Sequence, residues 1–202
     1  MSDPPLSYMI TEGAATADNF KTVMPGILRG IRRASDAGVR LIQVREKNLP
    51  ARCVQTLAAR AVDICRATSS RVLVNERFDI AIASGAAGVQ LTSRSVPLAR
   101  VRKVCPTGFV IGVSTHSLRE VIEARDQGAD FALFGPVFDT PSKRKFGAPK
   151  GIRSLAKTAA GVEGFPVIAV GGINRSNIAD ILECGASGYA AIRMFWHDTE
   201  PG

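Results

Sequence analysis

Three polar side chains, Gln43, Arg45 and Lys47, stand at alternate positions directly after an apolar run. Alternate side chains of a strand point to the same face, so all three could reach one space. Two cations on a buried face need an anionic partner, because leaving buried charges unpaired is costly. A bound diphosphate or carboxylate would be such a partner. The alternative interpretation is a strand edge whose charges are solvated.

His116 follows another apolar run and is one of only two histidines in the chain. The ordinary pKa of an imidazole suits proton transfer near neutral pH. The hydroxyls of Ser114, Thr115 and Ser117 could fix the tautomer of the ring. The alternative is a loop histidine that is hydrogen-bonded and takes no part in chemistry.

The pair Gly171-Gly172 could expose backbone N–H groups to a phosphate. Asn174 or Ser176 could then cap the following helix, whose positive end would face the anion. An isolated glycine pair can also serve only as a tight turn. A second candidate is Lys143, with Thr140 and Ser142 beside it, which is either a phosphate clamp or part of a basic loop.

Eight short apolar or β-branched runs could position these residues, and segments with helical apolar spacing lie between them. Short joints between alternating strands and helices require parallel strands, because each helix carries the chain back by a right-handed crossover. The candidate residues lie at or just after the carboxyl ends of the strands. The predicted strands cover residues 8–11, 39–44, 71–74, 88–91, 109–113, 130–134, 166–170 and 188–192.

The strand count favours a closed, compact (β/α)8 TIM barrel over an open doubly wound sheet, and no G-x-G-x-x-G follows the first strand. We expect a single domain over residues 1–202, with its active site at the carboxyl ends of the strands. The last helix is truncated, because Phe195 to Asp198 leave room for little more than one turn. A partner subunit would cover this gap, or the chain is incomplete. Glycines that can end helices in the left-handed conformation occupy four similar joints: Gly38, Gly85, Gly128 and Gly185.

The composition, with 46% hydrophobic and 22% charged residues, is that of an ordinary globular protein. A net charge of +8 could attract nucleic acid, a membrane surface or a phosphorylated metabolite. Lys and Arg are scattered without interleaved aromatic residues, so no nucleic-acid partner is expected. No apolar segment is long enough to span a membrane and no signal-peptide pattern is present, which predicts a cytoplasmic protein. The four cysteines are widely spaced and predict neither disulfides nor a zinc site.

Five motifs resemble, in order and spacing, those of the thiamin phosphate synthases and their TenI relatives. Each motif alone is weak, but five in order at predicted strand ends form a specific signal. The likeness runs from about Tyr8 to Phe195. The motifs are Q-V-R-E-K (43–47), N-E-R (75–77), G-V-S-T-H (112–116), F-G-P-V-F-D-T-P-S-K (134–143) and A-V-G-G-I (169–173).

The resemblance implies an enzyme of thiamin biosynthesis that condenses hydroxymethylpyrimidine diphosphate with thiazole phosphate, giving thiamin phosphate and diphosphate. Its catalytic residues would be Lys143 and Arg45, whose fixed cations would stabilise the charge on the departing diphosphate, and His116 would be catalytic in a TenI-type proton transfer. Its substrate-binding residues would be Gln43, Lys47, Asn75, Ser114, Thr140, Ser142, Gly171, Gly172, Ile192 and Arg193.

For a synthase, the resemblance also implies a magnesium ion held by two carboxylates. Here the first of these positions is Glu76, and the second falls at Ser95, beside Arg94. Magnesium prefers a tight octahedral shell of oxygen ligands, so a longer side chain and a lost carboxylate weaken the site. Arg94 could replace part of the charge of the metal, although it cannot reproduce its geometry.

TenI-type proteins share this loss, and His116 matches the histidine that serves them as proton shuttle when they aromatise a thiazole carboxylate phosphate without a metal. A thiazole tautomerase is therefore the runner-up to the synthase. Another alternative is a non-catalytic protein that binds thiazole phosphate or thiamin phosphate, and a further one is an unrelated phosphate-binding barrel. Retention of Gln43, Lys47 and Lys143 favours the synthase. The expected ligands are small phosphorylated molecules, and a homo-oligomer is possible.

Overall fold

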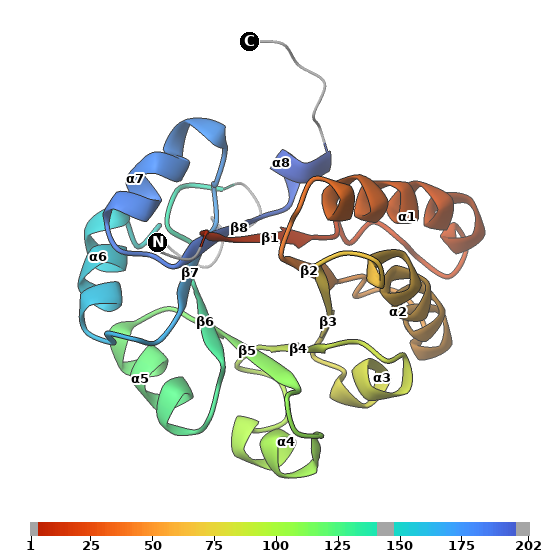
Figure 1. Cartoon of the computed structure of the whole chain (residues 1–202), viewed down its shortest axis with the longest axis horizontal. Helices are drawn as coiled ribbons and strands as arrows, with labels where there is room; N and C mark the ends of the chain where they lie inside the picture. The colour runs from red at the N-terminus through yellow and green to blue at the C-terminus, as the bar shows by residue number, and fades with distance from the viewer. Residues whose placement is uncertain (1–3, 141–147, 197–202) are drawn as a thin grey trace.

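Eight parallel strands form a closed barrel in the computed structural model, which describes residues 4–140 and 148–196. Each strand pairs with its sequence neighbours, and β8 pairs with β1 to close the ring (Figure 1). The expected TIM barrel is therefore confirmed. The strands are β1 (Leu6–Ile10), β2 (Leu41–Val44), β3 (Arg71–Asn75), β4 (Gly88–Leu91), β5 (Val110–Thr115), β6 (Phe131–Phe134), β7 (Val167–Val170) and β8 (Gly188–Ala191).

Helices surround the barrel as an outer layer (Figure 1). None of them, within the described ranges, is long and apolar enough to cross a membrane. They are α1 (Phe20–Asp36), α2 (Ala51–Cys65), α3 (Phe78–Ala83), α4 (Leu98–Val104), α5 (Leu118–Asp126), α6 (Ile152–Ala160), α7 (Ile178–Glu183) and α8 (Arg193–Trp196), with a 3-10 turn, η2 (Arg175–Asn177), before α7.

The strand ends differ from the predicted ones by one or two residues, for identifiable reasons. β1 begins at Leu6 because Leu6 and Ser7 pair with β8, a partner far away in the sequence. β2 begins at Leu41 and not at Val39, because the Val39 N–H still donates to the Ala34 carbonyl at the end of α1.

The four joint glycines adopt the predicted left-handed conformation. Their φ angles are 79° at Gly38, 69° at Gly85, 93° at Gly128 and 89° at Gly185. A residue with a Cβ atom rarely adopts this conformation, so glycine allows each helix to stop and the chain to enter the next strand at once.

Most of the core lies between the barrel and the helices, while a smaller apolar cluster fills the barrel interior around Tyr8, Leu73, Phe131 and Ile168. The Tyr8 and Phe131 rings meet edge to face with centroids 5.8 Å apart. A Cβ atom at Gly112 would lie 2.2 Å from the Phe131 ring, so glycine makes room for this packing. The interior is thus filled, and a ligand must bind above it, at one end of the barrel.

The short eighth helix packs against α1 through one aromatic side chain. The Trp196 indole N–H donates to the Ile10 carbonyl at 3.2 Å, and its ring lies over Gly30 of α1. The short helix was predicted, and Figure 1 shows it between α7 and α1. A homo-oligomer remains a prediction.

Replacing Gly30 with alanine is expected to destabilise the fold, because the new Cβ atom would lie 2.2 Å from the Trp196 ring. The indole would have to move away, losing its packing and its hydrogen bond, at a cost of about 1–3 kcal/mol. Thermal unfolding followed by circular dichroism measures this loss. Gly26→Ala, where the nearest atom is 3.8 Å away, is the matched control in the same helix. Equal unfolding temperatures for the two variants would contradict the proposed role of Trp196.

Candidate active site

A buried polar network crosses the barrel interior below the carboxyl ends of the strands. The Tyr8 hydroxyl accepts a hydrogen bond from Gln43 Nε2 at 2.8 Å and donates to Gln90 Oε1 at 3.2 Å. Gln90 Nε2 in turn donates to Ser114 Oγ at 3.1 Å. Burial raises the pKa of the Tyr8 phenol well above its ordinary value, so it remains a donor.

This network brings two predicted site residues, Gln43 and Ser114, into one connected group. It also determines which atom of each amide takes part: Gln43 uses its nitrogen toward Tyr8, so its oxygen is left for other partners. Tyr8 and Gln90 were not predicted as site residues, because nothing in the sequence indicates which strands meet across the interior.

Replacing Tyr8 with phenylalanine is expected to lower the free energy of unfolding by about 1–3 kcal/mol, because buried amide groups of Gln43 and Gln90 lose their partner. Denaturant unfolding measures the effect. Ser7→Ala is a control on the same strand, where the hydroxyl accepts only an exposed N–H. A Tyr8→Phe variant as stable as the parent would show that the network contributes no stability.

Arg45 and Lys47 lie in the loop after β2, which ends at Val44, so the prediction that both alternate with Gln43 along one face of a strand is wrong. The chain leaves the strand because Arg45 N–H donates to Thr11 Oγ1 and the Leu49 N–H closes a turn onto the Glu46 carbonyl. Gln43 alone of the three is buried inside the barrel, while Arg45 is half-buried and Lys47 is exposed.

The two cations nevertheless lie close together. The pKa of Arg45 is lowered, first by burial, against the opposing fields of Glu46 and Glu76. The pKa of Lys47 is lowered by burial and then by the positive charges of Arg45 and Arg94, with Glu76 acting in the opposite sense. Among the described residues, neither side chain has a hydrogen bond or ion pair. They therefore form a pair of cations that interact with Glu46 and Glu76 through space without a direct ion pair.

Glu76 directly follows β3 in the left-handed conformation, with φ 60°. Its Oε1 accepts from the Thr92 hydroxyl at 2.6 Å, and its Oε2 accepts from Asn75 Nδ2 at 3.1 Å. Glu76 thus links the predicted ligand Asn75 to Thr92 in the loop after β4.

The residues around Glu76 do not fit a two-carboxylate magnesium site. Ser95 Oγ accepts the Thr92 N–H at 2.9 Å and so supports the turn of its own loop. No group of three acidic, histidine or cysteine side chains that could hold a metal occurs within residues 4–140 and 148–196. The nearby side chains that remain unpaired are cations instead.

His116 lies at the end of β5, and its Nδ1 is 2.5 Å from the Gly135 carbonyl at the end of β6. Because a carbonyl can only accept, Nδ1 carries the proton, and Nε2 of the neutral ring keeps its lone pair. The prediction that neighbouring hydroxyls fix this tautomer is wrong. Ser114 binds Gln90, and Ser117 caps α5 by accepting the Glu120 N–H.

Gly171 and Gly172 follow β7 with φ angles of 98° and 66°. A Cβ atom at Gly172 would lie 2.7 Å from the Asp139 carbonyl, so the two loops pass closer than any other residue type allows. Asn174 caps the 3-10 turn η2 and not α7 itself, with its Oδ1 accepting the Ser176 N–H at 2.9 Å. Asn177 Nδ2 donates to the Gly172 carbonyl at 3.0 Å, which orients the loop.

The remaining predicted residues are only partly placed. Ile192 follows β8 and packs against the interior cluster, and Arg193 is the exposed first residue of α8. Thr140 is the last residue before the undescribed segment 141–147. Ser142 and Lys143 fall within that segment, outside the described residues.

Sequence reasoning missed Glu46, a buried carboxylate in the loop after β2. Its oxygens accept the N–H groups of Gly13 at 3.1 Å and Ala15 at 2.9 Å. It therefore ties the loop after β1 to the loop that carries Arg45 and Lys47. An acidic residue between Arg45 and Lys47, two residues expected to bind substrate, is the sequence feature that could have indicated this supporting role.

Residues 8–195 match the family model described as thiamine monophosphate synthase. The chain belongs to this family. Members that resemble it include a Geobacter sulfurreducens protein with a provisional thiamine-phosphate synthase name, 41% identical over 195 residues, covering 96% of this chain and 88% of the relative. The thiamine-phosphate synthase of Methanoculleus marisnigri is 37% identical over 161 residues, covering 80% and 76%. A solved thiamine phosphate pyrophosphorylase from Pyrococcus furiosus superimposes with a TM-score of 0.79 at 32% identity, over 93% of this chain and 85% of the other.

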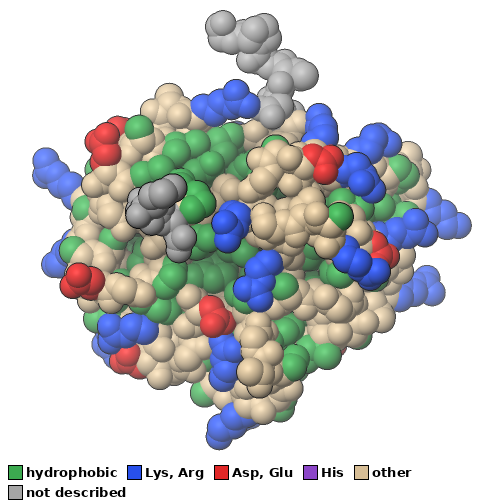
Figure 2. Space-filling model, viewed as in Figure 1, with side chains coloured by type: hydrophobic (Ala, Val, Ile, Leu, Met, Phe, Trp, Pro, Cys, Tyr) green, Lys and Arg blue, Asp and Glu red, His purple; other side chains and the backbone are tan. Residues whose placement is uncertain are grey.

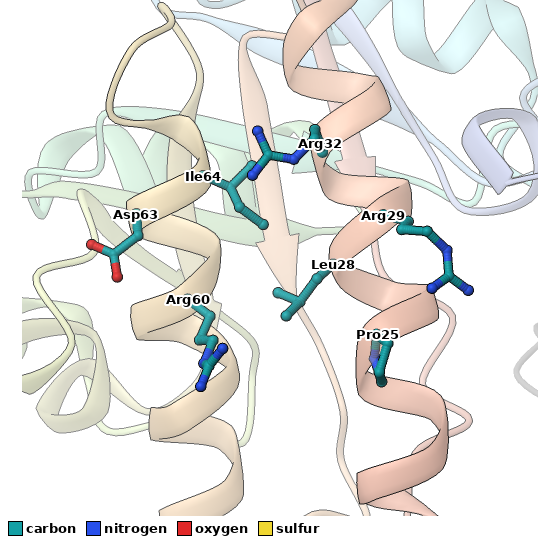
Figure 3. Close-up of a pocket in the computed structure, with 7 residues that line it drawn as sticks. All are labelled: Pro25, Leu28, Arg29, Arg32, Arg60, Asp63 and Ile64. Carbon is teal, nitrogen blue, oxygen red and sulfur yellow. The ribbon is translucent and has the colours of Figure 1, made fainter.

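Two surface grooves lie away from the strand ends where this thiamine monophosphate synthase family member carries its predicted site. One, of about 370 Å³, lies outside the barrel between α1 and α2, with Leu28, Arg32 and Ile64 among its lining residues (Figure 3). The other, of about 560 Å³, lies beside Pro166 and Ser187, before β7 and β8. Lys and Arg are spread over the face shown in Figure 2, with acidic and apolar side chains between them, and form no continuous basic stripe there.

Proposed function

We propose that this chain is a thiamin phosphate synthase, which joins hydroxymethylpyrimidine diphosphate to thiazole phosphate and releases diphosphate. The observation that carries the proposal is the pair of unpaired cations, Arg45 and Lys47, above the polar network of Gln43 and Ser114. The family match and the names of the relatives support the same reaction.

In this reaction the bond between the pyrimidine methylene carbon and the diphosphate oxygen breaks, and the electron pair leaves with the diphosphate. A new bond then joins the methylene carbon to the thiazole. Arg45 and Lys47 would stabilise the negative charge that builds on the departing group, because both positive charges are already present at this end of the barrel before the reaction begins. Lys143, in the undescribed segment, is proposed to act with them. The Gly171-Gly172 turn would bind the thiazole phosphate through backbone N–H groups.

The small ligands proposed here are thus the phosphorylated pyrimidine and thiazole. Magnesium is assigned no protein site and no step, because the two acidic side chains whose fields reach Arg45, Glu46 and Glu76, already accept hydrogen bonds on both of their oxygens. A cytoplasmic location is part of the proposal. All four cysteines lie in the described ranges and are free, which agrees with a reducing compartment.

The proposal is tested by incubating the purified protein with both substrates, with and without magnesium, and following thiamin phosphate by chromatography. Product formation is expected, and it should be lost on Lys143→Ala and change little on His116→Ala. No product under any of these conditions would reject the synthase.

The tautomer of His116 favours one second candidate, a thiazole tautomerase. With Nδ1 bound to the Gly135 carbonyl, Nε2 could accept a proton from a ligand and return it elsewhere on the ring. Aromatisation of thiazole carboxylate phosphate that disappears in His116→Ala, without thiamin phosphate formation by the parent, would establish this activity in place of the synthase. Tight binding of thiazole phosphate with neither reaction would leave a binding protein.

A further inference from the structure

Arg94 is an exposed cation on the loop after β4, next to the residues that hold Glu76. Its backbone N–H donates to Thr92 Oγ1 at 3.3 Å, and the same hydroxyl donates to Glu76 Oε1. Its positive charge helps to lower the pKa of Lys47, on the loop after β2, so the two side chains are close enough to interact electrostatically. Within the described part of the chain, the Arg94 side chain has no hydrogen bond or ion pair.

The loops after β2 and β4 thus carry three cations, and the loop after β3, which lies between them in the barrel, carries the carboxylate of Glu76. Both oxygens of this carboxylate accept hydrogen bonds, and Ser95 Oγ, on the loop after β4, already accepts the Thr92 N–H. A divalent cation placed here would face three positive charges and two carboxylates, Glu46 and Glu76, that already accept hydrogen bonds, which is an unfavourable balance. A ligand with several negative charges would instead be attracted by the excess of positive charge.

We propose that Arg94, together with Arg45 and Lys47, binds the diphosphate group directly, so that this chain holds diphosphate without requiring a divalent metal. The inference rests on the proposed synthase function and extends it by naming the side chains that balance the negative charge of the diphosphate leaving group. Arginine suits this role because its planar donors can contact two phosphate oxygens at once.

The test is isothermal titration of the whole chain with sodium pyrophosphate, once in EDTA and once in excess magnesium, so that no turnover is needed. The variants are Arg94→Ala and Arg94→Lys, of which the second keeps the positive charge but loses the planar set of donors. Arg100→Ala is the matched control, since Arg100 is an exposed arginine on α4 that makes no ion pair with any described residue. Thermal unfolding of each variant checks that the fold is unchanged.

We expect the parent to bind pyrophosphate in EDTA, with an affinity that magnesium leaves unchanged or lowers. Arg94→Ala should weaken binding in EDTA about tenfold, Arg94→Lys should recover part of it, and Arg100→Ala should change it less than about twofold. The double variant Arg94→Ala/Ser95→Asp should bind pyrophosphate more tightly with magnesium than without it.

Two results would overturn the inference while leaving the synthase function intact: pyrophosphate binding by the parent that needs magnesium, or an Arg94→Ala variant with the parent's affinity in EDTA. No pyrophosphate binding by the parent in either buffer, together with no thiamin phosphate formation, would overturn the proposed function as well.

Discussion

Replacing Arg45 with alanine is expected to lower kcat/KM for thiamin phosphate formation by about 100- to 1000-fold. Arg45 is half-buried, and its guanidinium has no hydrogen bond or ion pair with a described residue. Its main-chain N–H donates to the Thr11 hydroxyl, which fixes the backbone from which the side chain extends. Such a charge, fixed before the substrate arrives, stabilises a developing anion without reorganisation. Steady-state kinetics with both substrates measure the effect.

The same substitution should leave stability nearly unchanged, with a melting temperature within about 2 °C of the parent. Burial, which lowers the pKa of Arg45, outweighs the favourable fields of Glu46 and Glu76, and the guanidinium makes no ion pair with a described residue. Arg40→Ala, which removes an exposed arginine just before β2, is the control and should retain full activity. A large loss of stability in Arg45→Ala, with activity falling in proportion, would mean that the residue is structural.

Replacing Gly172 with alanine is expected to weaken thiazole phosphate binding at least about tenfold and to cost about 1–3 kcal/mol of stability. Gly172 has φ 66°, and a Cβ atom would lie 2.7 Å from both the Asp139 carbonyl and the Phe138 Cβ. The loops after β6 and β7 would be forced apart, and the N–H groups proposed to bind phosphate would move. Titration with thiazole phosphate and thermal unfolding measure the two effects.

Gly164 provides a matched control for this substitution. It also has a left-handed φ, of 80°, but no atom lies within 4 Å of the position of its Cβ. Gly164→Ala should therefore carry the backbone strain alone and leave ligand binding unchanged. If both variants bind thiazole phosphate as the parent does, the glycine pair after β7 does not form a phosphate site.

The order of the elements could be predicted from the sequence because the signals for it are local. Apolar runs identify the strands, and glycines such as Gly38 and Gly185 identify the joints, since a left-handed residue must occupy each of them. The exact ends of β1 could not be predicted, because its first residues are extended only through pairing with β8, at the other end of the chain.

The candidate site was predictable in part, for the same reason. Position after a strand identified Arg45, Glu76 and His116 as residues at one end of the barrel. The hydrogen-bond partners within the site could not be predicted, because they come from distant parts of the chain. Tyr8 donates to Gln90, 82 positions away, and the partner of His116 is a backbone carbonyl that no side-chain pattern reveals. Residue types thus indicate which groups could do chemistry, whereas closure of the barrel decides how each is oriented.

The pairing of β8 with β1 also has a consequence for synthesis of the chain on the ribosome. Strand β1 is made early, yet one of its hydrogen-bonding edges, from Leu6 to Met9, has no partner until Gly188–Ala191 have been translated. Throughout that interval the nascent polypeptide carries an open strand edge with unpaired N–H and C=O groups, the kind of feature that favours aggregation and chaperone binding.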